Sequence, residues 1–215
     1  MGLYNFIQSC FTALFPSRCP YCNSVIYSNE KMCNDCYNKC TVENIFTTLN
    51  TSKNISPYRY DGIFSKAIKD FKFYGYFNYG EQLAYVMVDS IKNAYSDISF
   101  DYIAYVPISK KKKRKRGYNQ SELLAKHISR CLNVPCKDIL LKIKENKTQH
   151  TLNRIDRAKN VTGCFSCNNK IDINNKNILL IDDILTTGAT LNECVSALNK
   201  GGANTICCAT FATVI

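Results

Sequence analysis

The strongest constraint on the fold is one stretch, residues 178–190, which reads Ile-Leu-Leu-Ile-Asp-Asp-Ile-Leu-Thr-Thr-Gly-Ala-Thr. Its four leading apolar residues suit a strand buried on both faces, which is typical of a parallel sheet covered by helices. Asp182 and Asp183 follow at the point where we expect that strand to leave the sheet. The apolar positions of residues 191–200 then recur at helical spacing. The stretch therefore predicts a strand–turn–helix unit of an α/β domain.

The turn of this unit has the chemistry of a phosphate site. Backbone N–H groups at a helix start lack partners and lie at the positive end of the helix dipole, so they bind anions. The hydroxyls of Thr186, Thr187 and Thr190 add donors. Gly188 lets the backbone close tightly around an anion. Because two carboxylates that suit sugar hydroxyls come just before the turn, we expect a sugar phosphate rather than a bare phosphate.

This stretch resembles the phosphoribosyl-pyrophosphate (PRPP) motif of the type I phosphoribosyltransferases, in which an apolar strand and two acids precede Thr-Thr-Gly-x-Thr. The resemblance implies that Asp182 and Asp183 hold the 2′- and 3′-hydroxyls of a ribose. The loop implied to wrap the 5′-phosphate comprises Thr186, Thr187, Gly188, Ala189 and Thr190. The alternative interpretation is a core strand, an acidic turn and a Thr-capped helix, as in many α/β proteins. Only the resemblance identifies the ligand as PRPP.

Upstream segments supply the remaining parts of such a sheet. Residues 58–62 suit a strand and turn, and residues 65–71 a short helix. The apolar spacing of residues 81–94 predicts a helix. Residues 102–106 suit a central strand that ends at Pro107, because proline cannot donate to a strand ladder.

Two segments combine charge or aromatic rings in ways that suit nucleic acid. The chain carries 28 Lys and Arg against 17 Asp and Glu, a net charge of +11, and seven of the cations lie in the run Lys110–Arg116. Such a run usually indicates a solvated segment or a nucleic-acid patch. Here it follows a strand end, where open α/β sheets bind ligands, and its arginines suit phosphate. Residues 72–77 are aromatic and basic; they suit base stacking, although we favour a hydrophobic hood over the sheet.

Four cysteines have the spacing of a metal site, in two Cys-x-x-Cys pairs. They are Cys19, Cys22, Cys33 and Cys36. Two such pairs, each on a tight turn, supply four thiolates for tetrahedral zinc, and a ribbon this short needs its metal to fold. A redox role is the alternative, and Cys40 is a possible substitute ligand. The pair formed by Cys164 and Cys167 stands alone and is interpreted as coincidence.

The remaining cysteine usage and the N-terminus indicate a cytoplasmic protein with reduced thiols. Thirteen cysteines form an odd number, which argues against a secreted disulfide framework. Residues 1–17 are apolar on one helical face and lack the basic start of a signal peptide. They are also too short to span a membrane, so we expect a docking helix and no transmembrane segment.

A narrower resemblance covers most of the chain. Residues 106–108, then Arg114, Arg116 and the string Gly-Tyr-Asn-Gln at 117–120, are similar to the ComF family of phosphoribosyltransferase-like proteins. Further matching positions lie in two other segments, residues 58–73 and 149–165. In the first segment, the early strand and its Lys-Phe-x-Gly hairpin match the family. In the second segment, the matching positions are Gln149, Leu152, Arg157, Asn160, Val161, Gly163 and Phe165. The family carries an N-terminal zinc ribbon, which agrees with the four cysteines.

This resemblance implies an α/β fold with a mainly parallel twisted sheet. The expected organisation is a docking helix over 1–17, a zinc ribbon over 18–45 and a phosphoribosyltransferase-like domain over 55–215. It implies transfer of ribose 5-phosphate from Mg²⁺-PRPP to a nucleobase-like acceptor, with Zn²⁺ structural. The implied catalytic residues are Asp182, Asp183, Arg114 and Arg116, the last two neutralising pyrophosphate in a mobile loop, and Pro107 borders the PRPP site. The alternative is a non-catalytic or PRPP-sensing module that binds single-stranded DNA or competence proteins.

Overall fold

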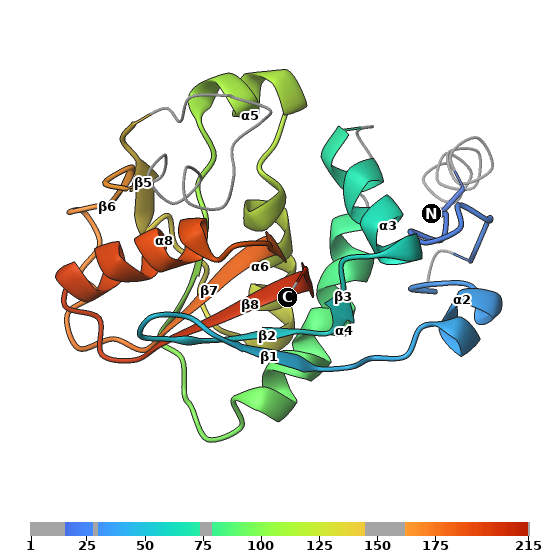
Figure 1. Ribbon diagram of the computed structural model, residues 1–215, viewed down its shortest axis with the longest axis horizontal. Helices are drawn as coiled ribbons and strands as arrows, with labels where there is room; N and C mark the ends of the chain where they lie inside the picture. The colour runs from blue at the N-terminus through green and yellow to red at the C-terminus, as the bar shows by residue number, and fades with distance from the viewer. Residues whose placement is uncertain (1–15, 28–29, 74–78, 145–161, 215) are drawn as a thin grey trace, which may run out of the picture.

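The computed structural model describes residues 16–27, 30–73, 79–144 and 162–214. Within them one sheet runs in the order β1-β2-β8-β7-β4, with β3 beside the end of β8 (Figure 1). Its strands are β1 (Ile45–Thr48), β2 (Lys53–Ser56), β3 (Tyr58–Arg59), β4 (Tyr102–Tyr105), β7 (Ile178–Leu185) and β8 (Ile206–Thr213). Only the β1–β2 pairing is antiparallel. The predicted α/β fold with a mainly parallel sheet is therefore confirmed.

The two central strands are buried because neighbours cover both of their faces. Every residue of β8 is buried, as are the first four residues of β7. β7 continues through the two acids to Leu185, where it still pairs with Thr213 of β8. The expectation that the strand ends before Asp182 is therefore wrong, because Asp182 itself remains in register with Thr210.

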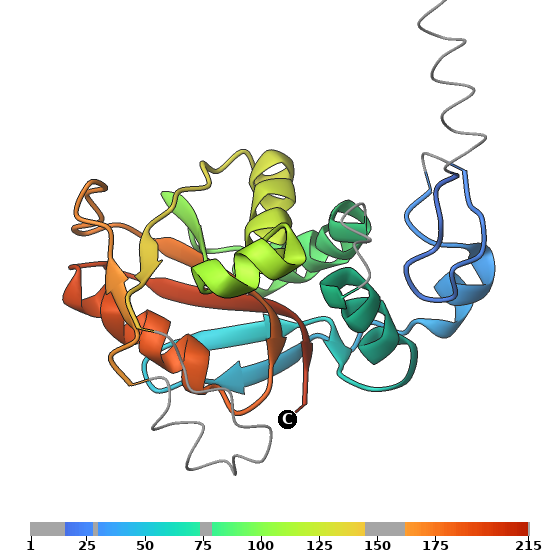
Figure 2. The same ribbon diagram turned by 90° about the horizontal axis from the view of Figure 1, so that it is seen from above.

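Helices cover the two faces of the sheet (Figures 1 and 2). One face carries α3 (Gly62–Phe73), α4 (Tyr79–Ala94) and α6 (Gln120–Leu132), whose apolar residues form a cluster with Ile181 and Phe211. The other face carries α8 (Ala189–Lys200) and a two-stranded antiparallel sheet of β5 (Leu140–Lys142) and β6 (Phe165–Cys167). The apolar side chains of both central strands thus pack into one of two apolar layers, as expected of a parallel sheet.

The basic run folds as a short helix, α5 (Lys110–Arg116), so the prediction of a loop there is wrong. The Ser109 hydroxyl caps its start by accepting from the backbone N–H of Lys112 at 3.3 Å. Gly117 ends it with a φ of +83°, a conformation that glycine adopts without a Cβ penalty. Lysine and arginine are good helix formers, so two suitable ends suffice for about two turns.

Several segments with a predicted role lie outside the described residues or have other contacts. The docking helix lies almost entirely outside the described residues, as do residues 74–77 and positions Gln149, Leu152, Arg157, Asn160 and Val161. Cys167 donates to the carbonyl of Ala197 at 3.1 Å, which agrees with a packing role for the Cys164–Cys167 pair. Among the helices of the described segments, none is long and apolar enough to cross a membrane.

Candidate functional site

The candidate site lies at the edge of the sheet where the parallel strands β4 and β7 end. Because parallel strands share one direction, their carboxyl ends meet at one edge, and ligands of open α/β sheets bind there. Pro107 and α5 follow β4, and the loop of residues 186–188 follows β7. This placement brings the acidic pair, the threonine loop and the start of α6 to the same edge.

The two acids face different partners. One oxygen of the Asp182 carboxylate accepts from the Ser121 hydroxyl at 2.7 Å and from the backbone N–H of Asp183 at 2.9 Å. The Asp183 carboxylate instead forms an ion pair with the ammonium of Lys72, at 2.8 Å. Both side chains of this ion pair are largely buried, at 19% and 10% exposure. The acids are therefore held in place by α6 and α3.

Burial, and next the neighbouring charge of Asp183, raise the pKa of the Asp182 carboxyl to about 7. The Ser121 hydroxyl and the ammonium of Lys72 act in the opposite direction. Two carboxylates at adjacent positions repel each other, and the low-dielectric surroundings strengthen that repulsion. The site therefore favours a ligand or cation that supplies donors or positive charge to both acids.

The threonine loop and Asp182 line one small hollow of about 40 Å³. Its remaining lining comes from both ends of the loop: Ile184, Leu185, Thr186, Gly188, Ala189, Thr190 and Leu191. Gly188 is the N-cap of α8, with a φ of +76°, and as a glycine it offers no side chain to cap the helix. A Cβ at Gly188 would also lie 3.2 Å from Leu49. The first N–H groups of α8 therefore adjoin the hollow without an N-cap side chain, which suits an anion.

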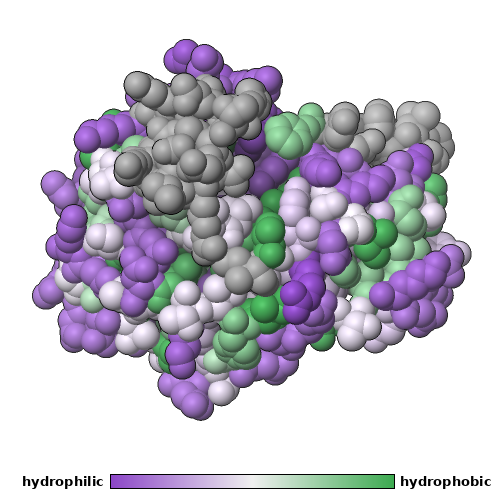
Figure 3. Space-filling view, in the orientation of Figure 1, coloured by the Kyte–Doolittle hydropathy of each residue, from purple (hydrophilic) through white to green (hydrophobic). Residues whose placement is uncertain are grey.

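Helix α5 gives the same edge its positive charge. Arg114 and the four leading lysines are exposed, and hydrophilic residues gather there at the upper edge of Figure 3. The Arg116 guanidinium lies over the Phe73 ring at 5.1 Å and donates to the Gln120 side chain at 2.9 Å. Pro107 is half-buried beside this segment. Among the described residues, Arg116 therefore contacts Phe73 and Gln120 rather than the acidic pair. Phe73 follows Lys72 in the sequence, and Lys72 pairs with Asp183.

Two further residues contact the acidic pair, Lys72 and Ser121, and no sequence motif predicted a role for either. Lys72 belongs to the segment interpreted as a hood, and Ser121 to the start of a helix. The signal for Ser121 is the preceding Asn119, which caps α6 through the Ser121 N–H at 3.1 Å and donates to the Val106 carbonyl at 3.0 Å. These bonds tie the start of α6 to the end of β4, which places Ser121 beside Asp182.

A second candidate centre is formed by the four predicted cysteines. The Sγ atoms of Cys19, Cys22, Cys33 and Cys36 all lie within 4.8 Å of one another. Cys40 lies outside this group, so the structure favours the predicted set. The second pair sits on a helix start rather than a tight turn, because Cys33 is the N-cap of α2 (Asn34–Lys39). Four converging thiols are a donor set that fits Zn²⁺.

Aromatic packing joins this cysteine-rich unit to the sheet domain. The buried Tyr21 ring lies edge-on to Tyr58 at 6.4 Å and to Phe64 at 5.8 Å. The hydroxyl of Tyr79 also donates to the side chain of Asn23 at 3.1 Å. Because Phe64 belongs to α3 and Tyr79 to α4, the unit contacts both helices directly.

Comparisons with known proteins agree with this architecture. Residues 119–214 match the model of the phosphoribosyl transferase domain. Competence protein F of Haemophilus influenzae is 34% identical over 65% of this chain and 63% of that protein. Competence protein ComFC of Bacillus subtilis is 29% identical over 86% of this chain and 72% of that protein. Together these matches support a ComF family protein.

The matches also support the phosphoribosyltransferase-like domain that the resemblance to the ComF family implied. Its match spans less than two thirds of the Haemophilus protein. The DNA utilization protein YhgH of Escherichia coli O157:H7 is 30% identical over 49% of this chain and 46% of that protein. A solved adenine phosphoribosyltransferase covers 66% of this chain and is itself covered to 84%, with 12% identity and a TM-score of 0.43.

Proposed function

We propose that this ComF family protein binds Mg²⁺-PRPP at the β7–α8 loop and transfers ribose 5-phosphate to a nucleobase-like acceptor, releasing pyrophosphate. One observation carries the proposal: Asp182 and the loop that starts α8 line the same hollow, at the carboxyl edge of the parallel sheet. A carboxylate beside the N–H groups that begin a helix matches a sugar hydroxyl beside a phosphate. The phosphoribosyl transferase match over residues 119–214 supports the same ligand class.

In this proposal each group has a simple task. The carboxylates of Asp182 and Asp183 accept from the two ribose hydroxyls and orient the sugar. Backbone N–H groups and hydroxyls from Thr186 to Thr190 hold the 5′-phosphate, so the reacting carbon is fixed relative to the acceptor. When bound with PRPP, Mg²⁺ supplies charge neutralisation for the departing pyrophosphate. The carboxylate oxygens of the acidic pair are the ligand type that Mg²⁺ prefers.

Positive side chains serve the leaving group. The C1–O bond to pyrophosphate breaks as the acceptor nitrogen bonds to C1, and negative charge builds up on the departing oxygens. Arg114 and Arg116 lie on α5, which follows β4 at the same sheet edge. Guanidinium groups contact phosphate through two parallel bonds, which suits this task. Lys72 adds a cation directly beside the acids.

A thermal-shift experiment tests the ligand. We expect Mg²⁺-PRPP to raise the melting temperature of the wild type, because a ligand that binds only the folded state stabilises it. The shift should vanish in the Asp182→Asn/Asp183→Asn protein. Asp97→Asn, which changes an exposed carboxylate away from the hollow, is the matched control and should keep the full shift. A wild type that does not respond to PRPP contradicts the assignment.

Turnover is tested separately. We expect pyrophosphate release from PRPP when the correct nucleobase is present in a panel, and none from the double variant. A protein that shows the thermal shift but releases no pyrophosphate with any base is a PRPP-binding module without transfer activity. Binding and catalysis are thus decided by two independent readouts.

A second candidate function is contact with single-stranded DNA, and α5 is the observation that favours it. The helix presents seven consecutive cations, six of them exposed, and stacks Arg116 on the exposed ring of Phe73. Cations and aromatic rings together are what single-strand sites use. Relatives named for competence and DNA utilization agree with this role. The two functions are compatible, because α5 lies next to the sugar-phosphate site without being part of its hollow.

A further inference from the structure

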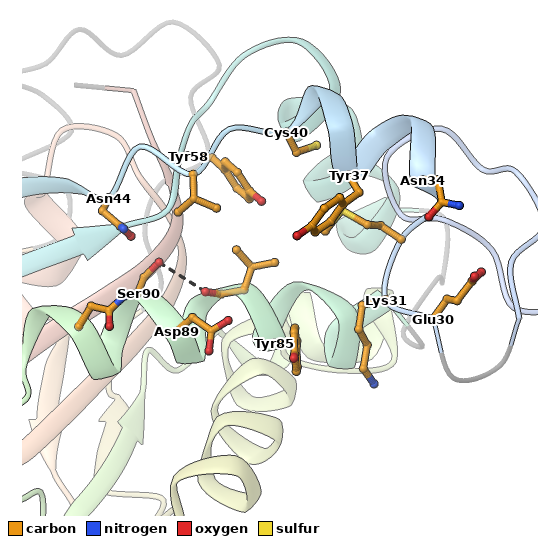
Figure 4. A pocket seen from close by; sticks show the side chains of 14 residues that line it. Glu30, Lys31, Asn34, Tyr37, Cys40, Asn44, Tyr58, Tyr85, Asp89 and Ser90 are labelled. Atoms are coloured by element: carbon orange, nitrogen blue, oxygen red, sulfur yellow. Dashed lines mark hydrogen bonds between the residues drawn. The ribbon is translucent and has the colours of Figure 1, made fainter.

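A larger hollow, of about 530 Å³, lies on another part of the molecule, between the cysteine-rich unit and α4 (Figure 4). One wall comes from residues between 30 and 40, together with Val42 and Asn44 in the segment that precedes β1. The other wall is α4, which contributes Tyr85, Val86, Asp89, Ser90 and Asn93. It shares no lining residue with the hollow at the acidic pair. Its volume is in the range of ligand pockets, which often form where two units meet.

The rim of this hollow exposes apolar surface. Tyr37 and Tyr85 are 71% and 49% exposed, and Val42 is 42% exposed. These three residues come from both walls, and Tyr37 projects from α2 toward α4 in Figure 4. Exposed aromatic rings around a concave surface are typical of a binding site rather than of ordinary surface. The floor is apolar as well, since Val86 and Tyr58 are buried there.

The charges in the lining indicate which kind of ligand the hollow favours. Its lining contains two carboxylates, Glu30 and Asp89, and one cation, Lys31. Lys31 is already paired with Glu81 at 2.8 Å, outside the lining, and its ammonium lies 5.8 Å from the Tyr85 ring. The hollow is therefore acidic in a protein whose net charge is +11. An anionic nucleotide is disfavoured here, whereas a planar cation meets aromatic faces and carboxylate acceptors together.

We propose that this hollow is a docking site for an arginine side chain presented by a segment of a partner protein. The guanidinium pairs with the carboxylate of Asp89 and lies against the ring of Tyr85 or Tyr37. Arginine suits such a site better than lysine, because its planar group both stacks and binds carboxylate through two bonds. The volume exceeds that of one side chain, so neighbouring apolar residues of the segment occupy the rest. This site is independent of the proposed PRPP chemistry.

The test uses the full-length zinc-loaded protein and a capped Ala-Leu-Arg-Leu-Ala peptide, followed by ¹H–¹⁵N NMR. The control peptide carries citrulline, which keeps the shape of arginine and removes its charge. We expect the arginine peptide to shift resonances of α2 and residues 85–93 and to bind at least fivefold more tightly than the citrulline peptide. Asp89→Asn and Tyr85→Ala should each weaken the arginine peptide at least fivefold.

Matched variants separate this site from general charge effects. Asp97→Asn removes an exposed carboxylate just beyond α4, and Tyr27→Ala removes a more exposed tyrosine outside the lining; neither should change binding. Circular dichroism verifies that each variant is folded. Equal affinity for both peptides, shifts located elsewhere, or no binding overturns the proposal. So does occupation of the hollow by a second copy, seen as self-association that Asp89→Asn abolishes while the peptide remains unbound.

Discussion

At the scale of single residues, the acidic pair is the most informative feature of this protein. Asp183 is neutralised by Lys72, whereas among the described residues Asp182 has a hydroxyl and an N–H donor at one oxygen. Burial therefore raises the pKa of Asp182 far above the ordinary aspartate value. A charge held in such surroundings costs stability, and functional sites are where proteins tolerate that cost.

This cost predicts that Asp182→Asn stabilises the folded protein near neutral pH. The native pKa of about 7 lies above the unfolded value of about 3.9. The native state therefore holds a proton that the unfolded state has lost, and stability from this group falls as pH rises between these values. We expect the variant to gain about 1–3 kcal/mol over the wild type at pH 8 and much less at pH 4.

Urea unfolding at both pH values measures this gain. Asparagine keeps the carbonyl oxygen that accepts from Ser121, so the local geometry is preserved. Asp97→Asn, an exposed carboxylate, serves as the control and should show no such pH-dependent difference. A gain that is the same at pH 4 and pH 8 contradicts burial of a charged Asp182.

What the sequence could predict at this scale was residue type and local spacing. The strand, the two acids and the Thr-Thr-Gly-Ala-Thr turn are contiguous, so their grouping is visible without a structure. Ser121 and Asp182 are separated by 61 positions, and no local pattern links them. Lys72 was not recognised for a related reason: it lies in the last turn of α3 among aromatic residues that suggest packing, and only the tertiary fold brings it to Asp183.

At the scale of elements, α5 shows how capping decides between loop and helix. The charge run alone indicated a solvated segment, and seven like charges repel each other. The Ser109 cap and the left-handed Gly117 overcome that repulsion over a short length. Lys113 is further paired with Glu122 of α6 at 2.9 Å. In a helix the cationic side chains have fixed relative positions, whereas in an irregular loop their spacing would vary.

The helix predicts a salt-sensitive contact with single-stranded DNA. Replacing Lys110, Lys111, Lys112 and Lys113 by alanine keeps the helix propensity and removes four charges. We expect affinity for an oligothymidine to fall about tenfold at low salt, with a shallower dependence on salt concentration because fewer counterions are released. Fluorescence anisotropy across a salt series measures both quantities.

The control for this experiment is matched in charge. Alanine at Lys69, Lys92, Lys137 and Lys200 also removes four exposed cations, from other surfaces of the molecule. If both quadruple variants lose affinity equally, binding depends on net charge alone, and α5 is not the DNA contact.

At the scale of the whole molecule, the cysteine-rich unit and the sheet domain are packed against each other. Tyr21, Tyr58 and Phe64 form a common aromatic cluster, and Lys31 forms an ion pair with Glu81. The sequence predicted the ligand spacing of the four cysteines. It could not predict this joint, because contacts between units depend on surfaces that become defined only after each has folded.

Because the two units are packed against each other, we expect that loss of the metal also lowers the stability of the sheet domain. We expect one Zn²⁺ per chain in the wild type, and nearly none in Cys36→Ser, with a melting temperature lower by about 5–10 °C. Cys40→Ser is the matched control and should retain its zinc, since Cys40 lies outside the group of converging thiols. Metal analysis together with thermal unfolding measures both. Equal zinc loss in the two variants contradicts the four-cysteine assignment.

The ion pair between Lys72 and Asp183 has a consequence for ligand choice. Because one acid already carries its own counterion, entry of a sugar is an exchange rather than an addition. An uncharged sugar that displaces the ammonium offers it hydroxyl oxygens but no negative charge in return. A sugar that carries phosphate groups gives the displaced ammonium a new anion at short range. On the proposed function, the ion pair that neutralises Asp183 therefore also favours anionic sugars over neutral ones.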